Sequence, residues 1–119
     1  MNRNLIIIFS FLFAQNIHSQ SMQATQWEEK RATTFTSYIA ENLEMNDRDK
    51  EFVHQVMLDR VVNARLKIRG NNLTQEEKKM IFQSEYANAQ SRLAEHFDVK
   101  TARKIMSLSN EARKAAETK

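Results

Sequence analysis

The side chains that could carry chemistry in this chain are few, and their spacing does not build an active site. The chain has no cysteine, which excludes a thiolate nucleophile and a metal site built on thiolates. Beyond residue 19 the histidines are His54 and His96, and no glycine-rich turn or serine elbow accompanies them. Paired carboxylates such as Glu28 and Glu29 are sequence neighbours, so on a helix they diverge. We therefore expect no enzymatic activity, no catalytic residue and no cofactor.

Metal binding has one candidate pair. His54 and Met57 are three residues apart and could share a helix face, whereas His96 is isolated and no His-x-x-x-His pair occurs. A helical histidine near an apolar stripe is more often a packing or surface residue than a ligand. The residues themselves predict no metal site, and a metal-sensing role stays open only as an alternative.

A basic stretch is the main candidate for binding a partner. It comprises Arg60, Arg65, Lys67 and Arg69, and two of these, Arg65 and Arg69, lie one turn apart on one helix face. One interpretation is structural, because cations near a helix C-terminus oppose the negative end of the helix dipole. The functional interpretation is a patch for acidic clients, anionic lipid or lipopolysaccharide.

Met80 is a second candidate for partner binding. Ile81 and Phe82 follow it directly, and three consecutive apolar side chains on a helix cannot all face one core. We expect an apolar side chain here to be exposed or to lie in a dimer interface.

Glycine and proline usage predicts the fold class. The chain has a single glycine, Gly70, and no proline. The tight turns of β-sheets favour glycine, so an all-α fold is expected. The formal net charge of +3 falls to +2 if Arg3 is removed with a leader, which is too mild to predict nucleic-acid binding.

Apolar periodicity predicts about four helices. The first runs from about Thr25 to Leu43, the second from Asn46 to about Arg69, and the third opens at Thr74. The fourth runs from about Val99 to Ala116, with a tail that frays from about residue 111. The stripes expected to face the core are Trp27, Phe35, Ile39 and Leu43; Val53, Met57, Val61, Ala64 and Ile68; Phe82, Tyr86, Ala89, Leu93 and Phe97; and Val99, Ala102, Met106 and Ala112.

Four residues are predicted to cap these helices. Asn46 is an N-cap residue, Gly70 sits where a left-handed glycine ends a helix, and Thr74 with Glu77 has the spacing of a capping box. The short turn between them predicts a long central antiparallel hairpin. A domain of this size buries only about 60–65% of its unfolded surface. The core is therefore thin, and we expect self-association, with a curved homodimer as one form.

The N-terminus has the layout of a secretory signal peptide. Arg3 supplies a positive charge, an apolar run follows from Leu5 to Ala14, and Ser19 offers a small residue for cleavage. The run is short of the roughly 20 residues that span a bilayer. We expect residues 1–19 to be removed, leaving 20–119 as one domain in the periplasm or outside the cell. The alternatives are a retained membrane anchor and a buried helix.

This plan resembles the LTXXQ-motif periplasmic proteins, the Spy and CpxP group, and small helical proteins exported by Bacteroidota. The nearest motif is Leu73-Thr74-Gln75-Glu76-Glu77, with Glu77 where the family has Gln. The resemblance implies a helical homodimer that holds unfolded clients, or an envelope-stress adaptor with a protein partner. The alternative it implies is a regulatory or metal-sensing module acting with a membrane sensor or an extracytoplasmic sigma-factor system.

Overall fold

The computed structural model describes residues 24–117, which form four helices and no strand. These are α2 (Gln26–Leu43), α3 (Asp47–Ile68), α4 (Gln75–His96) and α5 (Val99–Glu117). The all-α fold with four helices is therefore confirmed. The expected signal peptide, residues 1–19, lies outside the described residues. Within the described range no helix is long and apolar enough to cross a membrane.

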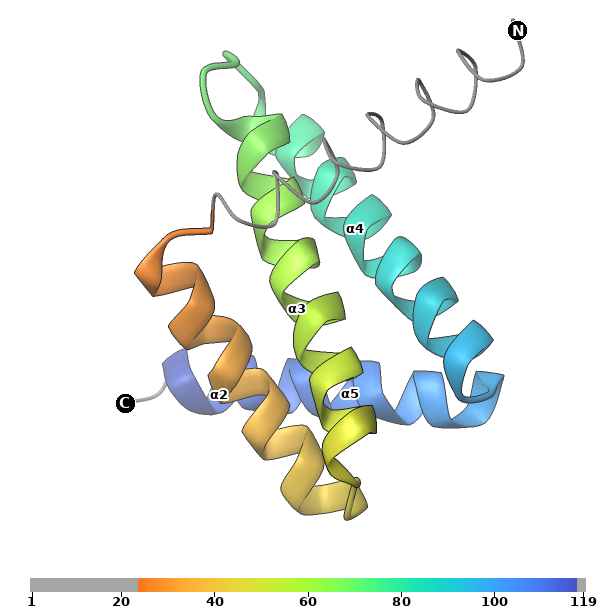
Figure 1. Ribbon diagram of the computed structural model, residues 1–119. Helices are drawn as coiled ribbons and strands as arrows, with labels where there is room; N and C mark the ends of the chain where they lie inside the picture. The colour runs from red at the N-terminus through yellow and green to blue at the C-terminus, as the bar shows by residue number, and fades with distance from the viewer. Residues whose placement is uncertain (1–23, 118–119) are drawn as a thin grey trace, which may run out of the picture.

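The helices form a layer of three with the fourth across it (Figure 1). α3 lies between α2 and α4 and packs on both, while α2 and α4 do not pack on each other. α5 runs across the layer and packs on α2 and α4. Figure 1 shows that the turn between α3 and α4 stands well away from α5, so α5 does not extend behind this end of the layer.

Side-chain caps fix where all four helices begin, and at α5 the carboxylate of Asp98 accepts a hydrogen bond from the backbone N–H of Thr101 at 2.6 Å. Thr25 and Glu28 form a capping box at the start of α2, and Thr74 and Glu77 form another at the start of α4. The carboxamide oxygen of Asn46 accepts a hydrogen bond from the backbone N–H of Asp49 at 2.8 Å, at the start of α3. Each cap satisfies a backbone N–H that has no partner inside its helix.

The turn after α3 requires glycine for a backbone reason. Arg69 has φ −63° and ψ 133°, Gly70 has φ +79°, and the N–H of Asn71 donates to the carbonyl of Ile68 at 3.2 Å. These values describe a type II turn, whose third residue needs a positive φ. A Cβ at Gly70 would meet no atom within 4 Å, so backbone strain alone opposes a side chain there.

The core lies where α5 crosses the layer. Phe35, Ile39, Met57, Leu93 and Met106 are buried in it together with neighbours from all four helices. The placement of Met57 in the core agrees with the helical stripe of α3. α5 remains helical to Glu117 through the stretch where we expected fraying, and Ala112 within that stretch is buried.

Candidate binding groove

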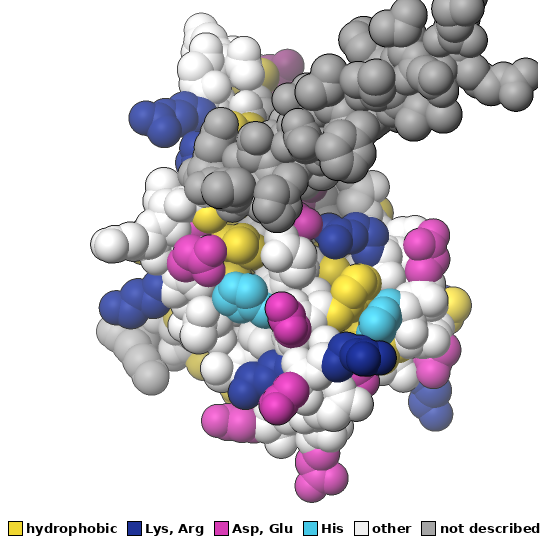
Figure 2. All heavy atoms as spheres, viewed as in Figure 1, with side chains coloured by type: hydrophobic (Ala, Val, Ile, Leu, Met, Phe, Trp, Pro, Cys, Tyr) yellow, Lys and Arg dark blue, Asp and Glu magenta, His cyan; other side chains and the backbone are white. Residues whose placement is uncertain are grey.

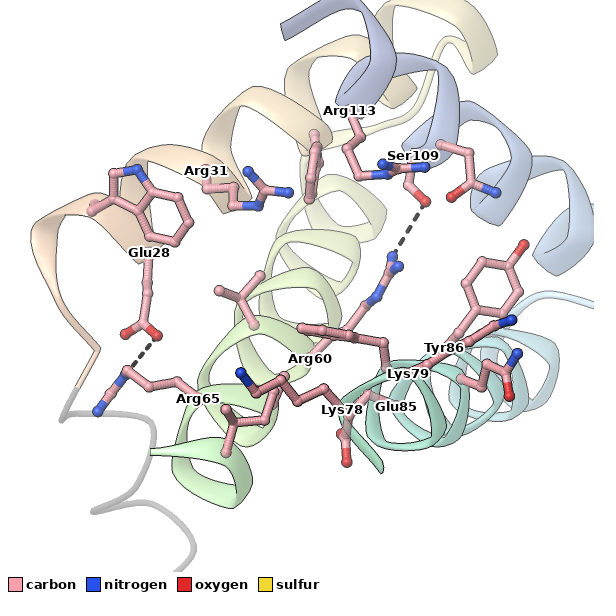
Figure 3. Close-up of a pocket in the computed structure, with 18 of the residues that line it drawn as sticks. Glu28, Arg31, Arg60, Arg65, Lys78, Lys79, Glu85, Tyr86, Ser109 and Arg113 are labelled. Carbon is pink, nitrogen blue, oxygen red and sulfur yellow. Dashed lines mark hydrogen bonds and ion pairs between the residues drawn. The ribbon is translucent and has the colours of Figure 1, made fainter. Parts of the chain in front are cut away.

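A groove of about 1130 Å³ opens between all four helices and borders the core at Phe35. It lies among the first turns of α2, the last turns of α3, the first half of α4 and the last turns of α5 (Figure 3). Its apolar wall comprises Trp27, Phe35, Val61, Ala64, Ile68 and Phe82, with the ring of Tyr86 beside them.

Two of the apolar wall residues correct the expected core. Trp27 and Phe82 fall on helical stripes that we predicted to face the core, yet they are 62% and 54% exposed. Each lies near the N-terminal end of its helix, and α2 and α4 do not pack on each other. The stripes therefore continue past the core into the groove. Val99, at the start of α5, is also an exposed stripe residue at 55%.

The groove carries an excess of positive charge. Seven cations line it against three carboxylates, which are Glu28, Glu85 and Glu117. Each carboxylate is already in an ion pair, since Glu28 binds Arg65, Glu85 binds Lys67 and Glu117 binds Arg113. The lining cations without a carboxylate partner within residues 24–117 are Arg31, Arg60, Arg69, Lys78 and Lys79.

An ion pair between Glu28 of α2 and Arg65 of α3 joins these two helices at one edge of the groove. Nε of Arg65 donates to Oε2 of Glu28 at 2.7 Å, and the N–H of Thr25 donates to Oε1 at 2.9 Å. Burial of Glu28, which is 1% exposed, would raise the pKa of its carboxyl group. The hydrogen bonds and the charge of Arg65 outweigh burial, so the pKa is lowered and the group is ionised at neutral pH.

Arg60 is a half-buried cation whose direct contacts are a hydroxyl group and an aromatic ring. Its Nη1 donates to the hydroxyl oxygen of Ser109 at 3.4 Å, and its Cζ lies 5.2 Å from the centre of the Tyr86 ring. Burial is the main cause that lowers the pKa of Arg60, and the charges of Arg113 and Arg31 act in the same direction. Tyr86 and Glu85 act in the opposite direction and do not cancel the effect.

The structure brings together part of the basic patch predicted from the sequence. Arg60, Arg65 and Arg69 line the groove. Lys67 does not line it and instead forms an ion pair with Glu85. Met80 is 61% exposed and also lies outside the groove lining.

Four lining cations were missed by sequence reasoning: Arg31, Lys78, Lys79 and Arg113. One signal was available for Arg31, which stands four residues from both Trp27 and Phe35. Its Cζ lies 5.2 Å and 5.0 Å from the centres of these two rings, as cation–π contacts at one-turn spacing allow. Arg113 reaches the groove only because α5 crosses the layer, which no local pattern predicts.

The two described histidines lie apart from each other and do not line the groove. His54 faces Glu29 at 3.3 Å, and His96 faces Asp49 at 3.1 Å while its ring stacks on Phe52. Figure 2 shows them as separate patches on one face. Among residues 24–117, no three His, Asp or Glu side chains are grouped closely enough to hold a metal ion.

Comparisons with known proteins identify no relative of this chain. No protein-family model, no curated protein and no solved structure matches this chain. The resemblance to the LTXXQ group therefore stays a prediction, and the groove itself carries the functional argument.

Proposed function

We propose that this chain is an exported, non-enzymatic binding protein that holds unfolded or partner protein segments in the groove. The observation that carries the proposal is the combination of exposed aromatic side chains with an excess of cations on one concave surface. A segment that presents apolar side chains beside carboxylates would complement both. This is the role that the LTXXQ resemblance implies, either as a chaperone-like protein or as an envelope-stress adaptor.

Apolar contact would supply most of the affinity. Trp27 and Phe82 expose more than half of their surface, and burying apolar surface contributes about 25 cal/mol per Å². Aromatic side chains in concave sites are the usual anchors of protein interfaces. The unpaired cations Arg69, Lys78 and Lys79 would add selection for acidic segments and faster association, both of which weaken in salt.

Suppression of client aggregation tests the proposal. A chemically unfolded acidic client is diluted into buffer with and without the protein, and light scattering is followed. Phe82→Gln should weaken protection about tenfold or more, since interface aromatics contribute about 2 kcal/mol or more. Val99→Gln is the matched control, because Val99 is equally exposed but lies outside the groove.

Three results would contradict the proposal. One is protection by Phe82→Gln that equals that of the unaltered protein. Another is an equal loss on Val99→Gln, which would place the contact elsewhere. The third is equal protection of acidic and basic clients at low salt, which would remove any role for the groove's charge. Protection of a broad set of acidic clients favours the chaperone-like form over an adaptor with one partner.

A further inference from the structure

Three guanidinium groups from three helices converge on one side of the groove (Figure 3). Arg31 comes from α2, Arg60 from α3 and Arg113 from α5, and we call these three residues the arginine cluster. The charges of Arg113 and Arg31 act on Arg60 in the direction that lowers its pKa. Because like charges repel, such a cluster is stabilised when an anion binds among its members.

The part of the chain that the structure describes supplies little negative charge to this cluster. Arg31 lies over the rings of Trp27 and Phe35, and the contacts of Arg60 are the Ser109 hydroxyl and the Tyr86 ring. Arg113 shares its charge with Glu117 in an exposed pair one helical turn apart, and such exposed pairs are weak because water screens both charges.

The other carboxylates of the groove are engaged elsewhere. Glu28 is held by Arg65 and Glu85 by Lys67. Taking a cation partly out of water costs free energy unless another group compensates its charge. Among residues 24–117 no carboxylate forms an ion pair with Arg60, which points to an anionic ligand.

The surface next to the cluster determines what kind of anion fits. The rings of Trp27 and Phe35 both lie against Arg31, and Val61 and Phe82 belong to the same apolar wall. A free inorganic anion would satisfy the guanidinium groups and leave this wall in water. A neutral apolar molecule would cover the wall and leave the charges unpaired. A molecule with an anionic head and a long apolar tail satisfies both.

We propose that the groove binds a long-chain carboxylate amphiphile of the fatty-acid class, with its head at the arginine cluster and its tail along Phe82 and Trp27. A guanidinium group offers two parallel N–H donors that match the two oxygens of a carboxylate. The groove volume of about 1130 Å³ is sufficient, since ligand pockets commonly span about 300–1000 Å³. This function goes beyond protein binding, and amphiphile and protein segment would compete for the same two aromatic side chains.

Binding of sodium laurate below its micelle concentration is the direct test. Trp27 is the only tryptophan of the chain and lines the groove beside Arg31, so its fluorescence reports binding, with calorimetry as a second measurement. Dodecanol has the same tail without the charge, and dodecyltrimethylammonium has the opposite charge. We expect laurate to bind at least tenfold more tightly than either, and acetate to give no signal.

Substitutions locate the head group. Arg113→Gln and Arg60→Met should each weaken laurate binding at least tenfold, which corresponds to about 1.4 kcal/mol. Arg103→Gln is the matched control, because Arg103 is on the same helix as Arg113 but is exposed and outside the groove. Circular dichroism checks the fold of each variant, and Arg113→Gln keeps the test valid if Arg60→Met unfolds.

Four outcomes would overturn the inference. These are equal affinities for laurate and dodecanol, no effect of Arg113→Gln, an equal effect of Arg103→Gln, and binding to phosphatidylglycerol vesicles without binding of laurate monomers. The last would indicate a membrane surface instead of a soluble amphiphile. If laurate does not bind but Phe82→Gln still weakens the protection of clients, amphiphile binding is excluded and protein binding remains supported. If laurate binds but Phe82→Gln protects clients as well as the unaltered protein does, protein binding is excluded and amphiphile binding remains supported.

Discussion

Replacing Glu28 by glutamine tests whether the edge of the groove holds the fold together. Oε1 of Glu28 accepts from the N–H of Thr25, and Oε2 accepts from Nε of Arg65. Glutamine keeps one acceptor oxygen and replaces the other by an NH₂ group, which can only donate. One of the two donors must then lose its partner, and the charge that attracts Arg65 disappears.

The expected loss is about 2 kcal/mol. Hydrogen bonds to charged groups contribute about 1.5–3 kcal/mol, whereas removing one partner of a fully buried ion pair costs about 3–5 kcal/mol. The lower range applies because the Arg65 side chain is 23% exposed and regains water when Glu28 no longer binds it. For a domain of this size, a loss of that magnitude lowers the melting temperature by about 8–16 °C.

Thermal unfolding followed by circular dichroism measures the effect at several pH values. The folded pKa of Glu28 is lowered, so its stabilisation is complete above its ordinary pKa of 4.5 and is lost as the pH falls through the folded value. The difference in melting temperature between the Glu28→Gln variant and the unaltered protein should therefore be largest at pH 7 and should decrease below pH 4.5.

The matched control for this experiment is Glu29→Gln. Glu29 is the next residue, and its exposed side chain faces His54 instead of Arg65. Its melting temperature should fall by less than about 8 °C, since exposed pairs contribute about 0–1 kcal/mol and each kcal/mol is worth about 4–8 °C in a domain of this size. A Glu28→Gln variant that melts with this control at pH 7, or a difference that is unchanged at pH 3, would refute the reasoning.

Three further predictions concern the turn, the assembly and the N-terminus. Gly70→Val with Thr74→Ala should lower the melting temperature by about 10 °C or more, because a positive φ disfavours valine and a helix cap is lost; equal melting would show that this turn does not limit stability. Light scattering after size exclusion should show a dimer at tens of micromolar, and a clean monomer would exclude it. Mass spectrometry of exported protein should find cleavage near Ser19, and an intact leader would support an anchor.

The helices were predictable because their signals are local. A capping side chain and its backbone partner are three residues apart, as in Thr74 and Glu77, so the sequence itself contains both members. The same holds for the single glycine, whose positive φ the turn requires. The helix limits observed in the structure lie within a residue or two of those that the apolar periodicity predicts.

The groove was less predictable because it forms where two helices, α2 and α4, do not pack on each other. Periodicity gives the face on which Trp27 and Phe82 lie, but not whether another helix covers that face. Burial of Glu28 was missed for the same reason. The sequence shows that Glu28 is an acidic residue near the start of a helix. Its partner Arg65 is 37 positions away in the sequence, so no local pattern indicates the pair. Only the packing of α2 on α3 brings the two side chains together.

The polar residues at the groove give a physical reason why it stays open in this structure. If α2 and α4 closed over the apolar wall, they would carry Arg31 and Lys78 toward Arg60, and the lining carboxylates are already paired with other cations. The charge repulsion would increase as water left, since interactions between charges strengthen in a medium of low dielectric constant. Apolar attraction therefore favours closure while uncompensated positive charge opposes it. An anionic ligand removes the opposing interaction, so binding and tighter packing of the four helices should occur together.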